Sequence, residues 1–197
     1  MGPAPDVAVA RADLGRTTVE SLRDAWGGGV ANWLNPGIAA EFTLAAIPGN
    51  RWAVWEGLQE QGIDLVVQPT AGRRKKMLLA DMDSTMIEQE CIDELGDLAG
   101  KGAQIAAITA RAMNGELDFE AALDARVSLM RNLPEAVIPQ VLRERITYMP
   151  GGAALIATMK ANGAYAALVS GGFTAFSESV AAHLGFDEHR ANRLLTS

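Results

Sequence analysis

The chain has 197 residues, 49% of them hydrophobic, and a formal net charge of −7. This length gives room for one full domain and a smaller one, with enough apolar residues to fill a sizeable core. The acidic balance argues against a nucleic-acid partner, and no uninterrupted apolar stretch is long enough for a membrane span.

Residues 1–70 are expected to form a small α+β domain. Its predicted strands and helices are Asp6–Ala10, Thr18–Ala25, Trp52–Gln61 and Ile63–Val67. Trp52 and Trp55 share one face of the second helix, and we interpret them as core residues, with ligand stacking as the alternative. This segment carries no visible chemistry.

Residues 71–76 contain the basic run Arg73-Arg74-Lys75-Lys76, which follows Pro69-Thr70-Ala71-Gly72. A charged run after turn-forming residues is typical of a solvated linker that leads into the next element. A nuclear signal or a phosphate-binding patch is the alternative.

From Met77 onward the pattern changes to strands that alternate with helices. The predicted elements are a strand at Met77–Ala80, a helical stretch over Ile87–Arg145, a helix that follows Pro150-Gly151-Gly152, a strand at Ala164–Val169 and a helix at Phe173–Leu184. This order favours an α/β core with a parallel sheet covered by helices, made of residues 77–86 and 146–197. Residues 87–145 are too many for a simple crossover and are expected to form an inserted helical cap.

Two aspartates follow the first core strand, in the stretch Asp81-Met82-Asp83-Ser84-Thr85. In extended chain, residues i and i+2 point the same way, so Asp81 and Asp83 are expected to face one cleft beyond the carboxyl end of the sheet. The second core strand ends there too, in Ser170-Gly171-Gly172, where a hydroxyl and free N–H groups can hold a phosphate. Isolated D-x-D pairs are often solvated turns or helix caps, but the two strand ends together favour a phosphate site.

Paired carboxylates beside a phosphate are tolerable when Mg²⁺ joins them, because Mg²⁺ prefers oxygen ligands. One carboxylate can then attack phosphorus to form an aspartyl-phosphate, while the other transfers protons. The cation and the N–H groups would stabilise the charge on the transferring group.

The motifs resemble those of the haloacid dehalogenase superfamily, through DMDST at 81–85 and LVSGGF at 168–173. Residues 87–100, 109–134 and 186–194 are similar to bacterial phosphoserine phosphatases in particular. The resemblance implies a Rossmann-like core, a helical cap and an ACT-like N-terminal domain. It also implies Mg²⁺-dependent hydrolysis of O-phosphoserine, a small-molecule substrate, as the last step of serine biosynthesis. Whether the protein forms a homo-oligomer is left open.

The resemblance assigns roles to the residues of the two strand ends. Asp81 would be the nucleophile and a metal ligand. Asp83 would be the general acid/base, with its backbone carbonyl on the metal. Ser170 and the Gly171 amide would hold the phosphate.

The resemblance also assigns substrate contacts in the cap. Glu90 would face the ammonium group of the substrate and Arg126 its carboxylate, a pairing that Arg geometry suits. By themselves Glu90 and Arg126 would be interpreted as surface charges; only their register with the motifs changes this. Phe119 and Met113 would line the apolar side of the cap, or would equally be core residues.

The chain departs from the family pattern in two ways. It has no Gly-Asp-Gly stretch to supply a further metal aspartate, and its last lysine, Lys160, precedes the Ser170 motif. Asp187 and Glu188 do not match the missing element. The chain is therefore expected to stop within or just after the third core strand, with an incomplete sheet and metal site and activity near background. A non-catalytic homologue that binds phosphate, serine or a partner chain, and a phosphotransferase, stay as alternatives.

The remaining reactive side chains receive no role. His183 and His189 lack the partners of a zinc site and are expected on the surface. Cys91 is the only cysteine, so no internal disulfide is possible, and no paired histidine supports a thiol nucleophile. The cysteine content and a first segment without signal-peptide character favour a cytoplasmic location.

Overall fold

The computed structural model describes residues 5–10 and 13–195. The chain divides into two compact units, Met1–Lys75 and Lys76–Ser197. Among the helices of the described part, none combines the length and the apolar character that crossing a bilayer requires.

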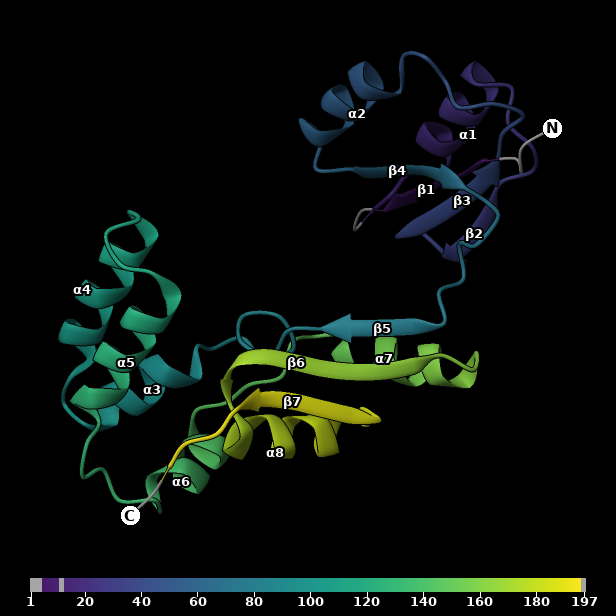
Figure 1. Cartoon of the computed structure of the whole chain (residues 1–197). Coiled ribbons are helices and arrows are strands. Elements are labelled where there is room, and N and C mark those ends of the chain that lie inside the picture. The colour runs from purple at the N-terminus through teal and green to yellow at the C-terminus, as the bar shows by residue number, and fades with distance from the viewer. Residues whose placement is uncertain (1–4, 11–12, 196–197) are drawn as a thin grey trace. The chain divides into compact units, whose positions relative to one another are not determined.

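The first unit is an antiparallel sheet with two helices (Figure 1). In chain order its elements are β1 (Pro5–Ala10), α1 (Arg16–Ala25), β2 (Asn32–Asn35), β3 (Ala39–Thr43), α2 (Arg51–Gln59) and β4 (Asp64–Pro69). The strands lie in the order β2-β3-β1-β4, and all neighbours are antiparallel, which is the interleaved β-α-β topology of ferredoxin-like domains. The expected likeness to ACT domains in particular stays a prediction.

Strands β2 and β3 were not among the predicted elements. The Asn35-Pro36-Gly37 stretch between them is typical of a loop, and it forms the tight turn of this hairpin, with Gly37 at φ 74° and the Ile38 amide bonded to the Asn35 carbonyl. The strands themselves are only four and five residues long, so their pattern gives little signal.

The interpretation of Trp52 and Trp55 as core residues is wrong. Trp52 is 62% exposed and Trp55 36%, whereas Leu58 of the same helix is buried against the sheet and Val54 packs on that core. Helix α2 therefore buries the stripe that contains Val54 and Leu58, and the tryptophans occupy the neighbouring stripe. There they meet edge to face and border a pocket beside strand β4.

The basic run is not wholly solvated, as a free linker would be. Arg73 is half-buried and forms an ion pair with Glu41 of strand β3, so this part of the run is fixed to the first unit. The assignment of residues 71–76 as a linker stays a prediction.

The second unit contains a parallel three-stranded sheet, in the order β5-β6-β7, as the sequence predicts for an α/β core (Figure 1). Its elements are β5 (Met77–Ala80), α7 (Gly152–Ala161), β6 (Tyr165–Phe173), α8 (Thr174–Leu184) and β7 (Glu188–Asn192). Helix α7 packs on β5 and β6, and α8 on β6 and β7. This is a Rossmann-type arrangement, in which the carboxyl ends of the three strands lie at one edge.

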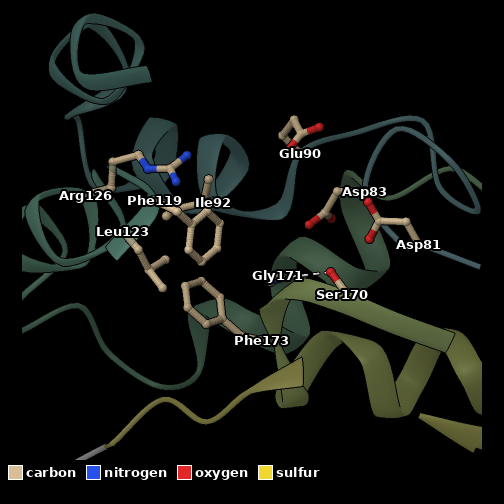
Figure 2. Close-up of a pocket in the computed structure, with 11 residues that line it drawn as sticks. Asp81, Asp83, Glu90, Ile92, Phe119, Leu123, Arg126, Ser170, Gly171 and Phe173 are labelled. Carbon is tan, nitrogen blue, oxygen red and sulfur yellow. Dashed lines mark hydrogen bonds between the residues drawn. The ribbon is translucent and has the colours of Figure 1, made fainter. Parts of the chain in front are cut away.

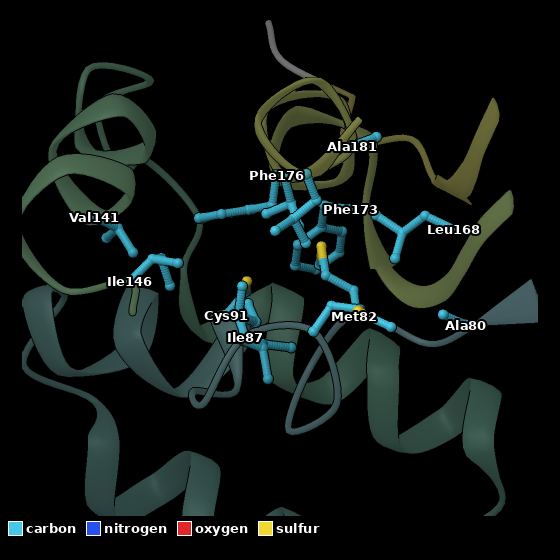
Figure 3. Packing of buried hydrophobic residues seen from close by; sticks show 14 of the residues in the cluster. Ala80, Met82, Ile87, Cys91, Val141, Ile146, Leu168, Phe173, Phe176 and Ala181 are labelled. Atoms are coloured by element: carbon cyan, nitrogen blue, oxygen red, sulfur yellow. The ribbon is translucent and has the colours of Figure 1, made fainter. Parts of the chain in front are cut away.

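A single apolar cluster holds the second unit together (Figure 3). Phe176 and Val180 of helix α8 are fully buried against Leu168 of strand β6 and Met82, which follows β5. Val141, from the helical segment between β5 and α7, belongs to the same cluster. Burial of this many large side chains contributes most of the stability of such a unit.

The helical segment between β5 and α7 forms four helices, α3 (Cys91–Leu98), α4 (Gly102–Met113), α5 (Phe119–Leu129) and α6 (Val137–Glu144). Helix α4 packs on α3 and α5, and α6 packs on α3 and α8. The chain leaves and re-enters the core through two extended stretches that pair at Ile87 and Tyr148, with the Glu88 amide bonded to the Thr147 carbonyl at 3.0 Å. These four helices are the segment expected to form the cap; its predicted boundaries at 87 and 145 stay predictions.

Candidate active site

The loop after strand β5 presents its two aspartates on the same side. The Met82 side chain between them is fully buried, so Asp81 and Asp83 point away from the core. The Met82 carbonyl accepts the amides of Thr85, Met86 and Ile87, which folds the loop into a compact turn. Asp81 is exposed, and its Oδ1 accepts the Met82 amide at 2.7 Å.

The Asp83 side chain is half-buried and lies beside the first residue of helix α3. Its Oδ1 accepts the amide of Cys91, the first residue of that helix, at 3.2 Å. Burial raises the pKa of Asp83, and the charges of Glu90 and Asp81 add to this effect, while the bonds from Cys91 oppose it. A carboxyl with a raised pKa is suited to carry a proton at neutral pH.

The end of strand β6 bulges beside these aspartates. Ser170 Oγ accepts the Gly172 amide at 2.9 Å. A Cβ atom on Gly172 would lie 2.9 Å from Asp83 Oδ2 and 3.1 Å from Ser170 Oγ, so only glycine lets this backbone approach the carboxylate so closely. The bulge and the loop after β5 therefore form one surface.

The helices of the expected cap supply the opposite side. Arg126 is half-buried on helix α5, and its Nε donates to the Ala122 carbonyl at 3.2 Å, which fixes the side chain along the helix. The Phe119 ring reaches the bulge, since a Cβ on Gly171 would lie 3.1 Å from Phe119 Cζ. Glu90 precedes α3 and accepts the Ser84 hydroxyl at 2.7 Å.

These groups border one pocket of about 250 Å³ (Figure 2). It is lined by Asp81, Asp83, Glu90, Ile92, Phe119, Leu123, Arg126, Ser170, Gly171, Gly172 and Phe173. All six site residues predicted from the sequence are in this set, although their roles stay predictions. Figure 2 shows Arg126 across the pocket from Asp81, with the apolar rings between Arg126 and the bulge.

The charges of the lining suit a divalent cation. Three carboxylates and one guanidinium line the pocket, so a dianionic phosphate would meet net repulsion without a further positive charge. No described group donates a hydrogen bond to the Asp83 carbonyl oxygen, which leaves this oxygen available beside the Asp81 carboxylate. One or two carboxylates with such an oxygen fit the way Mg²⁺ is usually held. Among the described residues no group of three or more acidic, histidine or cysteine side chains is placed to hold a metal.

Several candidate residues lie outside the pocket. Met113 is 86% exposed, so it neither lines the pocket nor belongs to the core. Cys91 is buried, and burial raises the pKa of its thiol strongly, which agrees with the absence of a nucleophilic role.

Neither histidine lies in the pocket either. His183 is exposed, as expected, and stacks on Tyr148 with 3.9 Å between ring centroids. The surface assignment of His189 is wrong: it is half-buried, and its Nδ1 shares a 2.9 Å hydrogen bond with the fully buried Ser177 hydroxyl. A buried hydroxyl requires a partner, and the histidine on the neighbouring strand supplies it.

The last lysine and the acidic residues near the end of the chain belong to a different part of the core. Lys160 forms an ion pair with Asp187 at 2.7 Å and donates to the Gly185 carbonyl. Asp187 precedes β7 at the amino end of the strands, away from the bulge. Neither residue stands in for the lysine or aspartate that the family pattern contains.

Two residues at the site were missed from the sequence. Ser84 and Asn192 bond to Glu90 and to the Gly171 carbonyl, respectively. Small polar residues give no periodic signal, and their position beside the motifs was the only available indication.

Curated proteins similar to this chain include several phosphoserine phosphatases. The enzyme of Albidiferax ferrireducens is 45% identical over 120 residues, which covers 60% of this chain and 51% of the relative. The enzyme of Vibrio cholerae is 47% identical over 118 residues, covering 60% of this chain and 36% of the relative. The chain thus spans about half or less of the length of these relatives.

Solved structures give a consistent result. A phosphoserine phosphatase determined as a phospho-aspartyl intermediate analogue is 39% identical with a TM-score of 0.58, and the match covers 62% of this chain and 58% of that one. A HAD family hydrolase from Salmonella enterica serovar Typhi has a TM-score of 0.85 at 25% identity. The match covers 98% of this chain and 69% of the Salmonella chain. This second match includes the N-terminal unit.

The family model of haloacid dehalogenase-like hydrolases matches residues 78–196, which contain both strand ends of the pocket and the helical segment between them. This is more than half of the chain. The fold, the pocket and the match agree, and the chain belongs to the haloacid dehalogenase-like hydrolase family.

Proposed function

We propose that this protein hydrolyses O-phospho-L-serine to L-serine and phosphate, with Mg²⁺, as the last step of serine biosynthesis in the cytoplasm. The observation that carries the proposal is the composition of one pocket. Paired aspartates and a glycine bulge form one side, and a carboxylate and a guanidinium, Glu90 and Arg126, come from the helical side. The second pair complements the ammonium and carboxylate groups of an amino acid.

In the first step Asp81 attacks phosphorus and the bond from phosphorus to the serine oxygen breaks. Asp83, whose pKa is raised by burial, gives its proton to the departing oxygen. Ser170 and the Gly171 amide hold the phosphoryl oxygens while charge develops on them.

In the second step water attacks the phosphorus of the aspartyl-phosphate. Asp83, now ionised, takes the proton from this water, and the bond between phosphorus and Asp81 breaks to release phosphate and restore the carboxylate. Asp83 thus acts once as an acid and once as a base.

The metal would be held by the Asp81 carboxylate and the Asp83 backbone carbonyl. When bound, Mg²⁺ supplies positive charge that offsets the repulsion between the phosphate and the acidic lining. Arg126 and Glu90 orient the serine portion, and Phe119 and Leu123 cover the pocket from the helical side.

Acid-quench trapping with radiolabelled phosphoserine tests this function. Wild-type protein and Asp83→Asn should retain acid-stable label, because the nucleophile is present in both, and Asp83→Asn should turn over about 10²–10⁴-fold more slowly. Asp81→Asn should carry no label. Equal labelling of Asp81→Asn and the wild type would rule out the nucleophile, and transfer of label to an added alcohol in place of water would indicate a phosphotransferase.

A second candidate is a non-catalytic homologue that binds phosphate or serine. It is favoured by one observation: Arg126 is the only cationic side chain that lines the pocket of the described chain, and no lysine reaches it. Saturable binding of phosphoserine to residues 1–197, without label or phosphate release, would support this candidate over the enzyme.

A further inference from the structure

The phosphate-binding bulge on strand β6 depends on the neighbouring strand β7. The pairing of the two strands passes from Val169 opposite Arg190 directly to Phe173 opposite Asn192. Ser170, Gly171 and Gly172 therefore face a single residue of β7, and their backbone groups are drawn out of the regular ladder. Such groups need other partners, or they lose a fixed orientation.

Asn192 provides one of these partners. Its Nδ2 donates to the Gly171 carbonyl at 2.8 Å. On the other side of the same peptide group, the Gly172 amide donates to Ser170 Oγ at 2.9 Å. The peptide that joins Gly171 to Gly172 is thus held at both its oxygen and its nitrogen.

The two bonds also direct the Ser170 hydroxyl. Because Ser170 Oγ accepts from the Gly172 amide, its own proton is available to donate to a ligand in the pocket. A carbonyl that accepts a hydrogen bond polarises its peptide group, so the bond from Asn192 strengthens the Gly172 donor on the other side. Glycine itself has no side chain to restrain this peptide, and without these bonds its backbone has wide freedom.

We propose that Asn192 is a positioning residue that fixes the Gly171–Gly172 peptide and thereby the phosphate-binding bulge. The inference rests on the proposed phosphate chemistry of the pocket, but the restraint on the peptide does not depend on which ester is bound. Asn192 touches neither substrate nor the reacting atoms; it acts through the backbone of the bulge.

The test compares Asn192→Ala with Asn162→Ala in the chain of residues 1–197. Asn162 is a matched control, because its Nδ2 also donates to a backbone carbonyl at 2.8 Å, that of Thr158 at the end of helix α7. The first measurement is the exchange rate of the Gly172 amide by NMR. We expect the Gly172 amide to exchange about tenfold faster in Asn192→Ala and at an unchanged rate in Asn162→Ala. A change of about tenfold corresponds to the upper end of the net stabilisation that one hydrogen bond provides.

The second measurement is the affinity for inorganic phosphate, followed through the Gly171 and Gly172 amide signals. It should fall in Asn192→Ala alone. Where the wild type turns over, kcat/KM should fall by about tenfold for both phosphoserine and p-nitrophenyl phosphate, since both esters use the same bulge. Asn192→Asp keeps the size of the side chain but cannot donate, and it should reproduce the loss if the alanine variant is unstable.

The outcomes separate this inference from the proposed function. Unchanged Gly172 exchange and phosphate affinity in Asn192→Ala would overturn the positioning role. A loss confined to phosphoserine would overturn it too, because it would place Asn192 at the serine portion. If the wild type hydrolyses neither ester, the proposed function fails, and the exchange and phosphate measurements still decide the role of Asn192.

Discussion

The hydroxyl of Ser84 donates a 2.7 Å hydrogen bond to Oε1 of Glu90. Ser84 adopts φ 52°, in the left-handed region that non-glycine residues rarely occupy, and its own amide donates to the Gln89 carbonyl. The turn thus directs a donor at the carboxylate that borders the pocket. A donor of this kind holds the Glu90 carboxylate in one orientation, in which it could bind an ammonium group.

Ser84→Ala should therefore weaken the recognition of the amino group. We expect kcat/KM to fall about tenfold for phosphoserine, the worth of a hydrogen bond to a charged group, and to change little for p-nitrophenyl phosphate, which has no ammonium. Ser128→Ala, at an exposed position of helix α5, is the control. Parallel losses on both esters would mean that Ser84 only supports the shape of the loop.

Arg126 should select esters that carry a carboxylate. Arg126→Ala leaves that carboxylate without a partner inside the pocket, at a cost of about 2–5 kcal/mol for phosphoserine. Arg126→Lys should recover only part of this loss, because an ammonium group cannot make the bidentate contact. Steady-state kinetics with phosphoserine and p-nitrophenyl phosphate measure the split, and a uniform loss on both would make the residue structural.

The two glycines of the bulge should respond differently to a methyl group. A Cβ on Gly172 would lie 2.9 Å from Asp83 Oδ2, so Gly172→Ala must displace the carboxylate or the bulge, and we expect about a 10²-fold loss on both esters. A Cβ on Gly171 would instead meet the ring of Phe119, which is 59% exposed and can move aside. Gly171→Ala should thus be milder, and the reverse order of the two kcat/KM values would contradict this geometry.

Asp187 should give the second unit a stability that depends on pH. The hydrogen bond from Lys160 and that from the Ala166 amide hold the pKa of Asp187 below its usual value, so ionised Asp187 stabilises the fold. For a carboxyl whose pKa is lower in the folded state, this contribution is complete above the unfolded pKa and disappears as the pH falls through the folded one. Asp187→Asn should lower the urea midpoint at pH 7, and the difference should shrink below about pH 5.

Asp124→Asn, at an exposed position of helix α5, is the matched control for this comparison. It should leave the midpoint nearly unchanged at both pH values. A deficit of Asp187→Asn that persists undiminished at pH 3 would show that the lost contribution is not electrostatic.

Much of the core could be predicted because its signals are local. Strand Met77–Ala80 was predicted with its observed limits, since a short apolar run directly before the aspartates has few other interpretations. Asp81, Asp83, Ser170 and Gly171 border one pocket because the ends of parallel strands meet at one edge of a sheet. Glu90 and Arg126 were identifiable only through family resemblance, because charged residues on helices are usually solvated.

What the sequence could not predict depends on contacts between distant residues. Trp52 and Trp55 have the spacing of a core stripe, but the adjacent stripe of the same short helix was the one buried. His189 was expected on the surface but is half-buried, and its hydrogen-bond partner, the Ser177 hydroxyl, lies on helix α8. Asn192 acquires its partner only through the shift in pairing between two strands, and no local pattern encodes such a shift.

The bond from the Cys91 amide to Asp83 has a thermodynamic consequence for the proposed reaction. Helix α3 begins at Cys91, and the carboxylate of Asp83 serves as an anionic cap for its first turn. Protonation of Asp83 removes that charge and weakens the attachment of helix α3. The same protonation supplies the proton that Asp83 donates as a general acid. By reciprocity, any movement that draws α3 away from Asp83 shifts the proton affinity of this carboxyl, and the two equilibria form one linked system.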